Sequence, residues 1–461
     1  MKLKSLATVL RETAFIVLLA GAVLLLEAWL LTAFYYDISI DGVLFHLRYY
    51  DTLFTSKAVN LVYAYVWGWT FLGVVAGYVL LHRYCRRYRW LMLAWLYLLL
   101  PAALIKTLDV GPYIFAARHE EGFYEQYYQK PEAKFVTAER PNLIIIYLES
   151  MERSFIERYS PEQVPSLKTY QQQELSFDRF ISVTGTWWTM GAIVGGWCGI
   201  PSQIRGNKLS FPNVICLPDI LAAYDYQMFF IKGSAVRFAG LDEFLLDHGF
   251  AADDFVGMMQ LMPQLKDIKI SSWGFEDAHI YKLFKQRLVK MAEQKQPFLA
   301  VMETIDTHQP YAEFPSQCSG SAAKFADVIR CADQQVTDFI KWFQKQEFAA
   351  NTVLVVMGDH HQMAQDWETA EFKSDIRRSI YNVIFNSRAK SEADKQHAIS
   401  TLDMFPTILE SLGMKVVNHR AGLGVSAFAP QTEPTLFEKL EVDELNRNLY
   451  GRSHFYQQFS Q

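Results

Sequence analysis

Three long apolar segments lie within the first 110 residues of the chain. They cover residues 13–34, 58–81 and 90–108, and Pro101 interrupts the third. Each is about as long as a helix that crosses the hydrocarbon core of a bilayer. A cleaved signal peptide does not fit the first segment, which is too long, lacks a small-residue cleavage site and is followed by further spans. The pattern predicts an all-α membrane domain of about three transmembrane helices over residues 1–110.

Basic residues in the short loops predict the orientation of these helices. Lys2, Lys4 and Arg11 precede the first span, and four arginines lie within residues 83–89, between the second and the third. Because basic loops stay on the cytoplasmic side, both groups are expected in the cytoplasm. Three spans then place the chain after about residue 110 on the opposite side of the membrane.

Residues 111–137 differ in pattern from the spans before them. Aromatic side chains alternate with charged ones there, which is typical of a helix lying on the lipid headgroups. An aromatic juxtamembrane linker is the alternative. We therefore expect an interfacial or linker segment over 111–137 and a separate domain over 138–461.

The rest of the chain alternates between two kinds of segment. Short apolar runs rich in β-branched residues predict buried strands, and longer amphipathic stretches between them predict helices. The predicted strands are 142–148, 227–231, 298–303 and 352–357, and the clearest helices are 278–294 and 326–344. Buried strands that alternate with helices indicate an α/β fold with a mostly parallel central sheet flanked by helices.

Composition and charge exclude two broad classes of protein. Hydrophobic residues make up 51% of the chain, which is too many for a disordered protein. Residues 1–110 hold 10 Lys+Arg and 6 Asp+Glu, so the overall net charge of −5 leaves about −9 on the remainder. An acidic second part lacks the basic field of a nucleic-acid binder, so no nucleic-acid partner is expected.

The cysteines agree with an exported second part. Cys85 lies in the predicted cytoplasmic loop, whereas Cys198, Cys216, Cys318 and Cys331 follow the last span. Four cysteines allow three pairings, of which we prefer the sequence-local one, Cys198–Cys216 with Cys318–Cys331. An oxidising compartment would keep such disulfides closed. Free buried thiols are the alternative.

Two predicted strands end in residues that bind metals. Glu149 follows strand 142–148, and Asp359, His360 and His361 follow strand 352–357 with one glycine between. Ligands collect at the carboxyl ends of parallel strands. Carboxylates with an imidazole suit Mn²⁺, Zn²⁺ or, less well, Mg²⁺. A glutamate that caps a helix and a structural Asp–His pair are the alternatives.

A candidate nucleophile lies between these two strands. Thr189 precedes a small, apolar run expected to form a tightly packed helix, so its hydroxyl would lie at a helix N-terminus that favours an anion. A metal that lowers its pKa would make it a nucleophile for phosphoryl or sulfuryl transfer. His308 could bind a phosphate oxygen or protonate a leaving group, and Lys232 could meet a phosphate as a point charge. An N-cap threonine, an idle loop histidine and a solvated lysine are the alternatives.

Several segments together resemble a known family. They are YLESMERSF, GTWWTMGAIVGGWCGIP, FAGLDEFLLDHGF, WGFEDA, TIDTHQPY, VVMGDHH, STLDMFPTILESLGM and RAGLGVSAF, within residues 140–430. In this order they resemble the sulfatase-like branch of the alkaline phosphatase superfamily. Within it, the chain is most similar to bacterial phosphoglycerol transferases that modify periplasmic glucans and, more distantly, to lipoteichoic acid synthases.

The resemblance implies roles for particular residues. Glu149, Thr189, Asp359 and His360 match the single divalent-metal site of the family, for which Mn²⁺ is our preferred metal, and Thr189 matches its nucleophile. His308 matches the histidine that engages the substrate headgroup. We also assign substrate contacts to Lys232, Trp188 and His361.

The resemblance also implies a reaction and a location. Such enzymes take phosphoglycerol from phosphatidylglycerol, leave diacylglycerol in the membrane and pass the group to a hydroxyl of an extracytoplasmic glycan. The setting would be a bacterial inner membrane, crossed several times, with the catalytic domain in the periplasm. The alternatives are a phosphoethanolamine transferase that modifies lipopolysaccharide or other envelope glycans, and a non-catalytic membrane sensor or assembly protein. A hydrolytic sulfatase is disfavoured because such enzymes usually need Cys or Ser where Thr189 stands. The sequence carries no signal for an oligomeric state.

Overall fold

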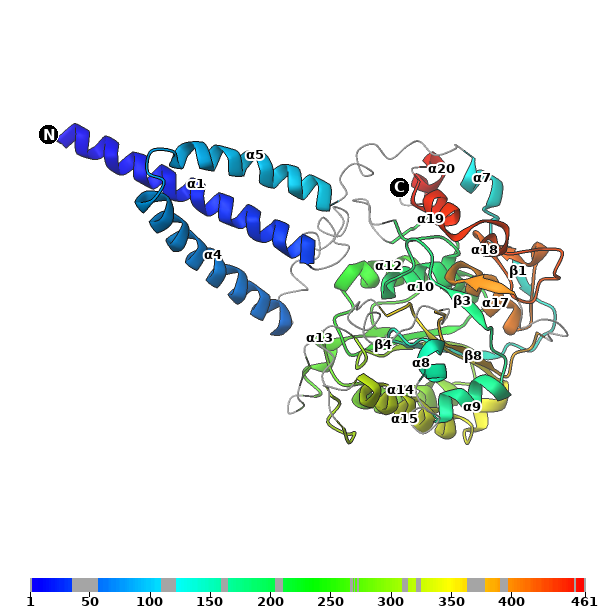
Figure 1. Ribbon diagram of the computed structural model, residues 1–461. Helices are drawn as coiled ribbons and strands as arrows, with labels where there is room; N and C mark the ends of the chain where they lie inside the picture. Colours follow the sequence, from blue (N-terminus) through cyan, green and yellow to red (C-terminus); the bar gives the residue numbers. More distant parts are fainter. Residues whose placement is uncertain are drawn as a thin grey trace. The chain divides into compact units, whose positions relative to one another are not determined.

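The computed structural model divides into two compact units, residues 1–117 and 118–461 (Figure 1). Each unit is described by itself. The residues that the structure describes are 2–34, 57–108, 122–158, 165–203, 210–265, 268, 270–271, 273–308, 314–320, 325–362, 378–389, 397–451 and 453–459.

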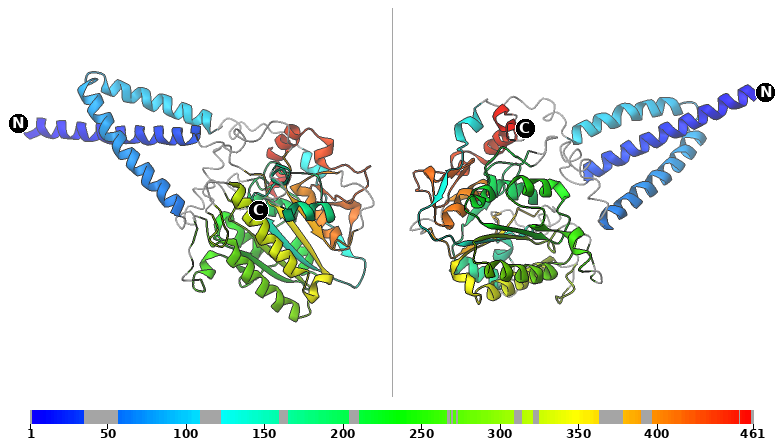
Figure 2. Two further views of the ribbon diagram at one scale, coloured as in Figure 1. Left: turned by 60° about the horizontal axis from the view of Figure 1, so that its bottom comes forward. Right: turned by 180° about the vertical axis from the view of Figure 1, so that it is seen from behind.

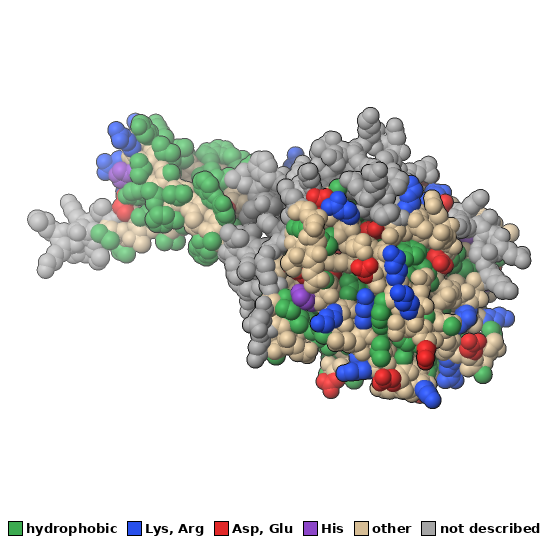
Figure 3. Space-filling model, turned by 90° about the horizontal axis from the view of Figure 1, so that it is seen from below, with side chains coloured by type: hydrophobic (Ala, Val, Ile, Leu, Met, Phe, Trp, Pro, Cys, Tyr) green, Lys and Arg blue, Asp and Glu red, His purple; other side chains and the backbone are tan. Residues whose placement is uncertain are grey.

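The first unit is helical. Helices α1 (Lys2–Phe34), α4 (Lys57–Arg83) and α5 (Arg89–Thr107) are each long and apolar enough to cross a membrane. Hydrophobic side chains dominate the described surface of this unit in Figure 3. The expected all-α region of three apolar helices is confirmed.

Polar side chains, as well as apolar side chains, form contacts between these helices. Arg89 Nη2 lies 2.5 Å from Glu12 Oε1, and its guanidinium lies over the ring of Phe15. Further along α1, Glu27 accepts a hydrogen bond of 2.5 Å from the hydroxyl of Thr70 on α4. Polar groups within membrane-spanning helices are commonly paired in this way.

The second unit is built on a six-stranded sheet with the order β5-β4-β6-β2-β7-β8. The first five pair in parallel, and β8 pairs antiparallel to β7. The bounds are β2 (Asn142–Leu148), β4 (Gln227–Lys232), β5 (Phe255–Val256), β6 (Phe298–Glu303), β7 (Thr352–Gly358) and β8 (Asn382–Phe385). Every residue of β2, β6 and β7 is buried, as a sheet covered on both faces requires. The predicted mostly parallel α/β fold is confirmed.

Helices cover both faces of this sheet (Figure 2). Helices α9 (Pro165–Gln173), α14 (Asp277–Glu293) and α15 (Phe325–Phe343) pack in one hydrophobic core with side chains from one face of the strands. The other face carries α10 (Thr189–Cys198) and α17 (Met404–Ser411), which pack against each other. Basic and acidic side chains are interspersed on the face of this unit seen in Figure 3.

Short elements complete the unit. The helices among them are α8 (Arg153–Arg158), α11 (Leu217–Ala222), α12 (Leu241–Asp247) and α13 (Met258–Leu261), with 3₁₀ turns at Phe238–Gly240, Glu347–Asn351, Thr401–Asp403 and Val417–His419. The two-stranded pairs are β3 (Arg179–Ile181) with β9 (Ala398–Ser400), β1 (Ala133–Phe135) with β10 (Met414–Val416), and β11 (Arg420–Ala421) with β12 (Gly424–Val425).

The described part of the expected linker is folded into this second unit. Residues 122–137 contain helix α7 (Phe123–Tyr127) and strand β1, which pairs antiparallel with β10. The buried hydroxyl of Tyr124 donates a 2.9 Å hydrogen bond to the carbonyl of Leu449. Aromatic residues that resembled an interfacial segment in the sequence therefore include core residues of the domain. Residues 111–121 of the expected linker lie outside the described part of the chain.

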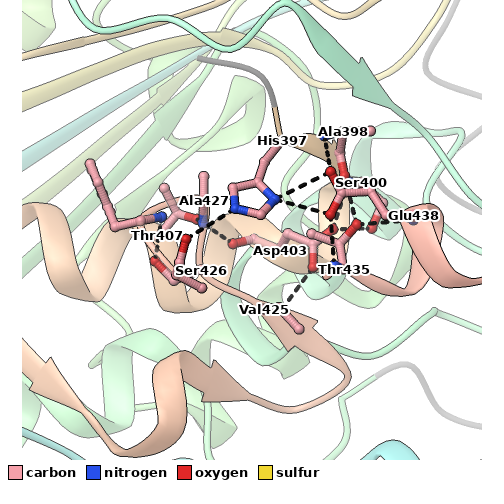
Figure 4. A network of polar contacts seen from close by, with 12 residues as sticks. His397, Ala398, Ser400, Asp403, Thr407, Val425, Ser426, Ala427, Thr435 and Glu438 are labelled. Carbon is pink, nitrogen blue, oxygen red and sulfur yellow. Dashed lines mark hydrogen bonds and ion pairs between the residues drawn. The ribbon is translucent and has the colours of Figure 1, made fainter. Parts of the chain in front are cut away.

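The C-terminal stretch is folded as well. It forms α18 (Leu436–Lys439), α19 (Val442–Tyr450) and α20 (His454–Gln457). Helix α18 is joined to β9 by the polar network in Figure 4, in which Nδ1 of His397 lies 3.0 Å from Oε2 of Glu438. The amide of Ala398 donates a 2.8 Å hydrogen bond to the same carboxylate.

Candidate active site

Strand register brings together the two segments that the sequence predicts to bind a metal. Strands β2 and β7 pair in parallel with Leu148 opposite Gly358, so the next residues, Glu149 and Asp359, leave the same edge of the sheet side by side. This edge is the carboxyl end of both strands, where open α/β sheets bind ligands.

Three side chains converge at this edge. Nε2 of His360 lies 3.2 Å from Oδ2 of Asp359 and 3.8 Å from Oε1 of Glu149, and one ligand atom from each residue lies within 4.8 Å of the others. All three side chains are at most 1% exposed. Oε2 of Glu149 is buried, and within the described chain it accepts no hydrogen bond. Two carboxylates and an imidazole form a donor set that suits Mn²⁺ or Zn²⁺, so these residues fit a single divalent cation.

Neighbouring groups hold the three ligands in orientation. The amide of Ser150 donates to Oδ1 of Asp359 over 2.7 Å, and its hydroxyl donates to Oε1 of Glu149 over 2.6 Å. Ser150 has a φ of 51°, an uncommon conformation for a residue other than glycine. Nδ1 of His360 lies 2.8 Å from the carbonyl oxygen of His361, which assigns the ring proton to Nδ1 and leaves Nε2 for a metal.

Burial sets the electrostatics of the cluster. It raises the pKa of Asp359 to about 6 and also raises the pKa of Glu149, although His360 opposes both shifts. Burial lowers the pKa of His360, but the carboxylates of Asp359 and Glu149 outweigh it, and the net shift is upward. Each carboxylate is costly to ionise without a nearby positive charge.

Thr189 begins helix α10 next to this cluster. Trp188 before it is extended, with φ −150° and ψ 156°. The side chain of Thr189 acts on the carboxyl of Asp359 and lowers its pKa, against the larger effect of burial. The turn before the helix folds tightly onto its first residues. A Cβ at Gly191 would lie 2.3 Å from the carbonyl oxygen of Gly185 and 2.6 Å from Nε1 of Trp188, so only glycine permits this approach. Thr189 is therefore held at a helix N-terminus, beside a candidate metal ligand.

A buried ion pair lies at the ends of two further strands. Lys232 and Glu303 are register partners on β4 and β6, and their Nζ and Oε1 atoms are 2.6 Å apart. The Lys232 charge acts on Glu149 and lowers its pKa, against the larger effect of burial. The sequence pointed to Lys232 but missed Glu303. The position of Glu303 at the end of a buried strand was the signal that could have identified it. Its pairing with Lys232 could not be predicted, because that depends on the order of the strands.

The loop after β6 brings His308 to the same edge. Thr304 Oγ1 accepts a hydrogen bond of 2.9 Å from the amide of Glu149, and Thr307 Oγ1 donates one of 2.5 Å to its carbonyl. His308 follows directly, and its ring packs on Trp273 with ring centroids 4.0 Å apart. The sequence singled out His308 but not Trp273.

A buried carboxylate fixes the backbone of that loop. Asp277, at the start of α14, accepts hydrogen bonds from the amides of Ile305 and Asp306 over 2.8 and 3.0 Å. Asp306 accepts one in return from the amide of Asp277, over 3.2 Å. The segment that contains Trp273 is thereby joined to the loop that presents His308.

The remaining predicted contacts differ in position. His361 is half-buried, and desolvation lowers its pKa to about 4. The charge of Glu152 opposes this shift, whereas that of Arg378, which is paired with Glu152, adds to it. Trp188 packs on the first turn of α10, whereas Trp187 is 52% exposed.

Two disulfides lie in this unit. Cys198 at the end of α10 is bonded to Cys216 just before α11, and Cys318 is bonded to Cys331 on α15. The first links helix α10 to its neighbour α11. Cys85 in the first unit is free.

Comparison with known proteins gives the same assignment of fold. A family model described as Sulfatase matches residues 141–414. Proteins named phosphoglycerol transferase I from Escherichia fergusonii and Citrobacter koseri are 29% and 28% identical over 69% and 68% of this chain, and over 43% and 42% of their own length. The chain thus spans about two fifths of the length of the curated relatives it matches.

Two solved structures share the fold. One is a protein in the alkaline phosphatase superfamily from Vibrio parahaemolyticus, with a TM-score of 0.54 and 19% identity over 69% of this chain and 77% of that one. The other is the lipoteichoic acid synthase LtaP from Listeria monocytogenes, with a TM-score of 0.52 and 18% identity over 65% of this chain and 80% of that one.

Proposed function

The chain belongs to the sulfatase family, and from that premise we propose that it is a membrane-anchored, metal-dependent phosphoglycerol transferase. It would take the headgroup of phosphatidylglycerol onto Thr189 and pass it to a hydroxyl of an extracytoplasmic glycan. The relatives named phosphoglycerol transferase I support the choice of headgroup.

The observation that carries the proposal is the position of Thr189. Its side chain lies at the N-terminus of α10 and lowers the pKa of Asp359, a member of the buried ligand set of Glu149, Asp359 and His360. A nucleophile beside a metal ligand at a helix N-terminus is arranged for attack on phosphorus. An ordinary N-cap threonine requires no such buried acidic cluster.

The residues of the chain divide the work of two steps. Glu149, Asp359, His360 and Thr189 would hold one divalent cation, preferably Mn²⁺, which when bound acidifies the hydroxyl and offsets negative charge on the phosphoryl group. Before the first step the Thr189 hydroxyl gives its proton to solvent water. In the first step its Oγ forms the bond to phosphorus while the bond from phosphorus to the diacylglycerol oxygen breaks. His308 donates the proton that this leaving oxygen takes up.

The second step reverses the roles. A glycan hydroxyl gives its proton to His308 and bonds to phosphorus, and the bond to Thr189 breaks. The free amide groups at the start of α10 would face the negative charge that develops in both steps, and such electrostatic stabilisation is usually the largest contribution to phosphoryl transfer. Lys232, Trp188 and His361 are proposed to contact the substrate.

The proposed location is a bacterial inner membrane with the catalytic unit in the periplasm. Three apolar helices long enough to span a bilayer support the anchor. Two disulfides in the second unit support an oxidising compartment. An anchored site meets a lipid donor at high effective concentration, which gives the arrangement a physical reason.

Intact-protein mass spectrometry tests the proposal. The full chain and its Thr189→Ala variant are incubated in detergent with Mn²⁺ and either phosphatidylglycerol or phosphatidylethanolamine. We expect a phosphoglycerol adduct on the wild type and none on the variant. A phosphoethanolamine adduct would instead identify a phosphoethanolamine transferase. If the experiment yields neither an adduct nor released diacylglycerol, the result favours a non-catalytic sensor or assembly protein.

A further inference from the structure

The turn that leads into the nucleophile helix is bonded to the C-terminal helix α19. The amide of Thr184 donates a 2.8 Å hydrogen bond to Oδ1 of Asn446, although the two residues are 262 positions apart in sequence. Thr184 lies five residues before Thr189 and is only 6% exposed. A backbone amide in such a place needs an acceptor, and Asn446 supplies it.

The other side of the same turn is held by the loop after α10. The amide and the hydroxyl of Ser202 both donate to the carbonyl of Gly185, over 3.2 and 2.8 Å. Gly185 has a φ of 81°, and a Cβ there would lie 2.7 Å from Cβ of Pro201. Residues 184 and 185 are thus fixed by one partner on each side, Asn446 and Ser202.

Helix α19 is itself held firmly in place. Leu445 and Leu449 flank Asn446 and are fully buried. The carbonyl of Leu449 accepts hydrogen bonds from the hydroxyl of Tyr124 over 2.9 Å and from Nε2 of Gln203 over 2.6 Å. Gln203 directly follows Ser202. Helix α19 and the loop after α10, which both hydrogen-bond to the turn, are therefore also bonded to each other.

An aromatic cluster completes this support. Tyr124 from α7 packs against Tyr456 from α20 with ring centroids 5.2 Å apart, and the Tyr456 hydroxyl donates to the carbonyl of Pro201 over 2.5 Å. Tyr128 and Phe459 extend the cluster, with centroids 4.9 Å apart. Helix α7 from the start of the described second unit and helix α20 from its end therefore both pack near the loop that holds the 184–185 turn.

We propose that Asn446 is a positioning residue for the nucleophile, and that the C-terminal helices support the active site. The inference rests on the proposed function, since it concerns the geometry of Thr189. The Thr184–Trp188 turn fixes the direction in which the chain enters α10, and so fixes where the Thr189 hydroxyl lies relative to Asp359. Loss of the Asn446 oxygen frees the Thr184 amide, and the turn can then move. A displacement of about 1 Å in a reacting group can lower a rate by about 100-fold.

The test compares three variants of the full chain in detergent. Asn446→Ala removes the acceptor, Asn446→Asp keeps an acceptor oxygen at the same position, and Asn448→Ala alters an asparagine on another face of the same helix. With saturating phosphatidylglycerol and Mn²⁺, we expect Asn446→Ala to slow formation of the Thr189 adduct by about 10- to 100-fold. Asn446→Asp should remain within about threefold of the wild type, and Asn448→Ala should be unchanged. KM for the lipid and Mn²⁺ affinity should change little, because Asn446 contacts neither.

Hydrogen exchange supplies a readout that does not require activity. Peptides covering residues 181–190 should exchange faster in Asn446→Ala than in the wild type and Asn446→Asp. If the wild type transfers no headgroup, the proposed function fails while exchange still tests the contact. An Asn446→Ala variant with wild-type adduct formation overturns the inference, and so does an Asn446→Asp variant that is as slow as Asn446→Ala. Should Asn446→Ala unfold at the assay temperature, Asn446→Gln, which displaces the amide by one methylene, takes its place; a wild-type rate there also overturns the inference.

Discussion

In this structure Nε2 of His360 lies 3.2 Å from Oδ2 of Asp359, and neither side chain is more than 1% exposed. Glu149 brings a second carboxylate to within 3.8 Å of the same nitrogen. Two buried carboxylates that both lie this close to one imidazole nitrogen also repel one another unless a positive charge lies between them. The cluster is therefore expected to gain stability from a divalent cation.

The first prediction concerns metal removal. Chelation should lower the thermal unfolding temperature of the full chain, and Mn²⁺ at about 100 times its Kd should restore about 2.7 kcal/mol of stability. Asp359→Asn and His360→Gln should abolish the Mn²⁺-dependent shift. His361→Gln is the matched control, and it should keep the shift because His361 is not one of the three residues whose ligand atoms converge at this site. An equal Mn²⁺ response in all three variants would show that Asp359 and His360 do not bind the metal.

The second prediction concerns pH and the buried carboxyl of Asp306. Burial raises its pKa from 3.8 to about 7, and it also raises the pKa of its neighbour Asp277. Between about pH 4 and 7 the folded state thus keeps a proton that the unfolded state has lost. Stability should fall as pH rises through this window, by at most about 1.4 kcal/mol per pH unit for each proton.

Asp306→Asn tests this pH dependence. The variant lacks the titrating group, so its stability should fall less steeply than that of the wild type between pH 4 and 7. Urea unfolding of the metal-free full chain at several pH values measures the difference. Parallel curves for the two proteins would contradict the assignment.

The sequence identified the features of this unit that are local. The runs at 142–148, 298–303 and 352–357 are β2, β6 and β7, with at most one residue added, because a strand buried on both faces reads as a continuous apolar run. Thr189 was expected at a helix N-terminus and begins α10. Strand ends then pointed to Glu149 and Asp359, since parallel strands deliver their carboxyl ends to one edge.

The features that the sequence missed depend on long-range pairing. Glu303 meets Lys232 only because β6 lies beside β4, and Asn446 reaches Thr184 across 262 positions. Tyr124 resembled an interfacial aromatic residue, yet it is 1% exposed in the core. No local pattern encodes these partners, because each is set by which elements pack together.

The third prediction concerns Gly358, which separates β7 from Asp359. A Cβ at this position would lie 2.1 Å from the carbonyl oxygen of Met151, so Gly358→Ala must displace backbone. We expect a loss of about 1–3 kcal/mol and weaker Mn²⁺ binding. Gly196→Ala is the control, because the atom nearest to its Cβ would be the Tyr147 hydroxyl oxygen, at 3.5 Å. Thermal unfolding and Mn²⁺ titration check both variants, and equal effects would contradict the steric argument.

The fourth prediction concerns the His397 network in Figure 4. Nδ1 of His397 faces the Glu438 carboxylate at 3.0 Å and Nε2 faces the carbonyl of Ala429 at 3.0 Å, so both ring nitrogens meet acceptors. His397→Leu should cost about 1–3 kcal/mol and increase hydrogen exchange over residues 435–439. His454→Leu, at an exposed position of α20, should change neither quantity. Unchanged exchange in His397→Leu would show that α18 is held by other contacts.

The last prediction separates a structural role of Lys232 from a functional one. Lys232 and Glu303 form a buried pair, so Lys232→Met or Glu303→Gln alone leaves a charge without its partner and should cost about 3–5 kcal/mol. The double variant Lys232→Met/Glu303→Gln removes both charges and should recover most of that stability. If Lys232 contacts the phosphoryl group, the double variant will fold and bind Mn²⁺ yet form the Thr189 adduct far more slowly than the wild type. Recovery of both stability and adduct formation would instead show that the pair only stabilises the sheet edge. The double variant has no positive charge at position 232, so adduct formation could not recover if the substrate needed that charge.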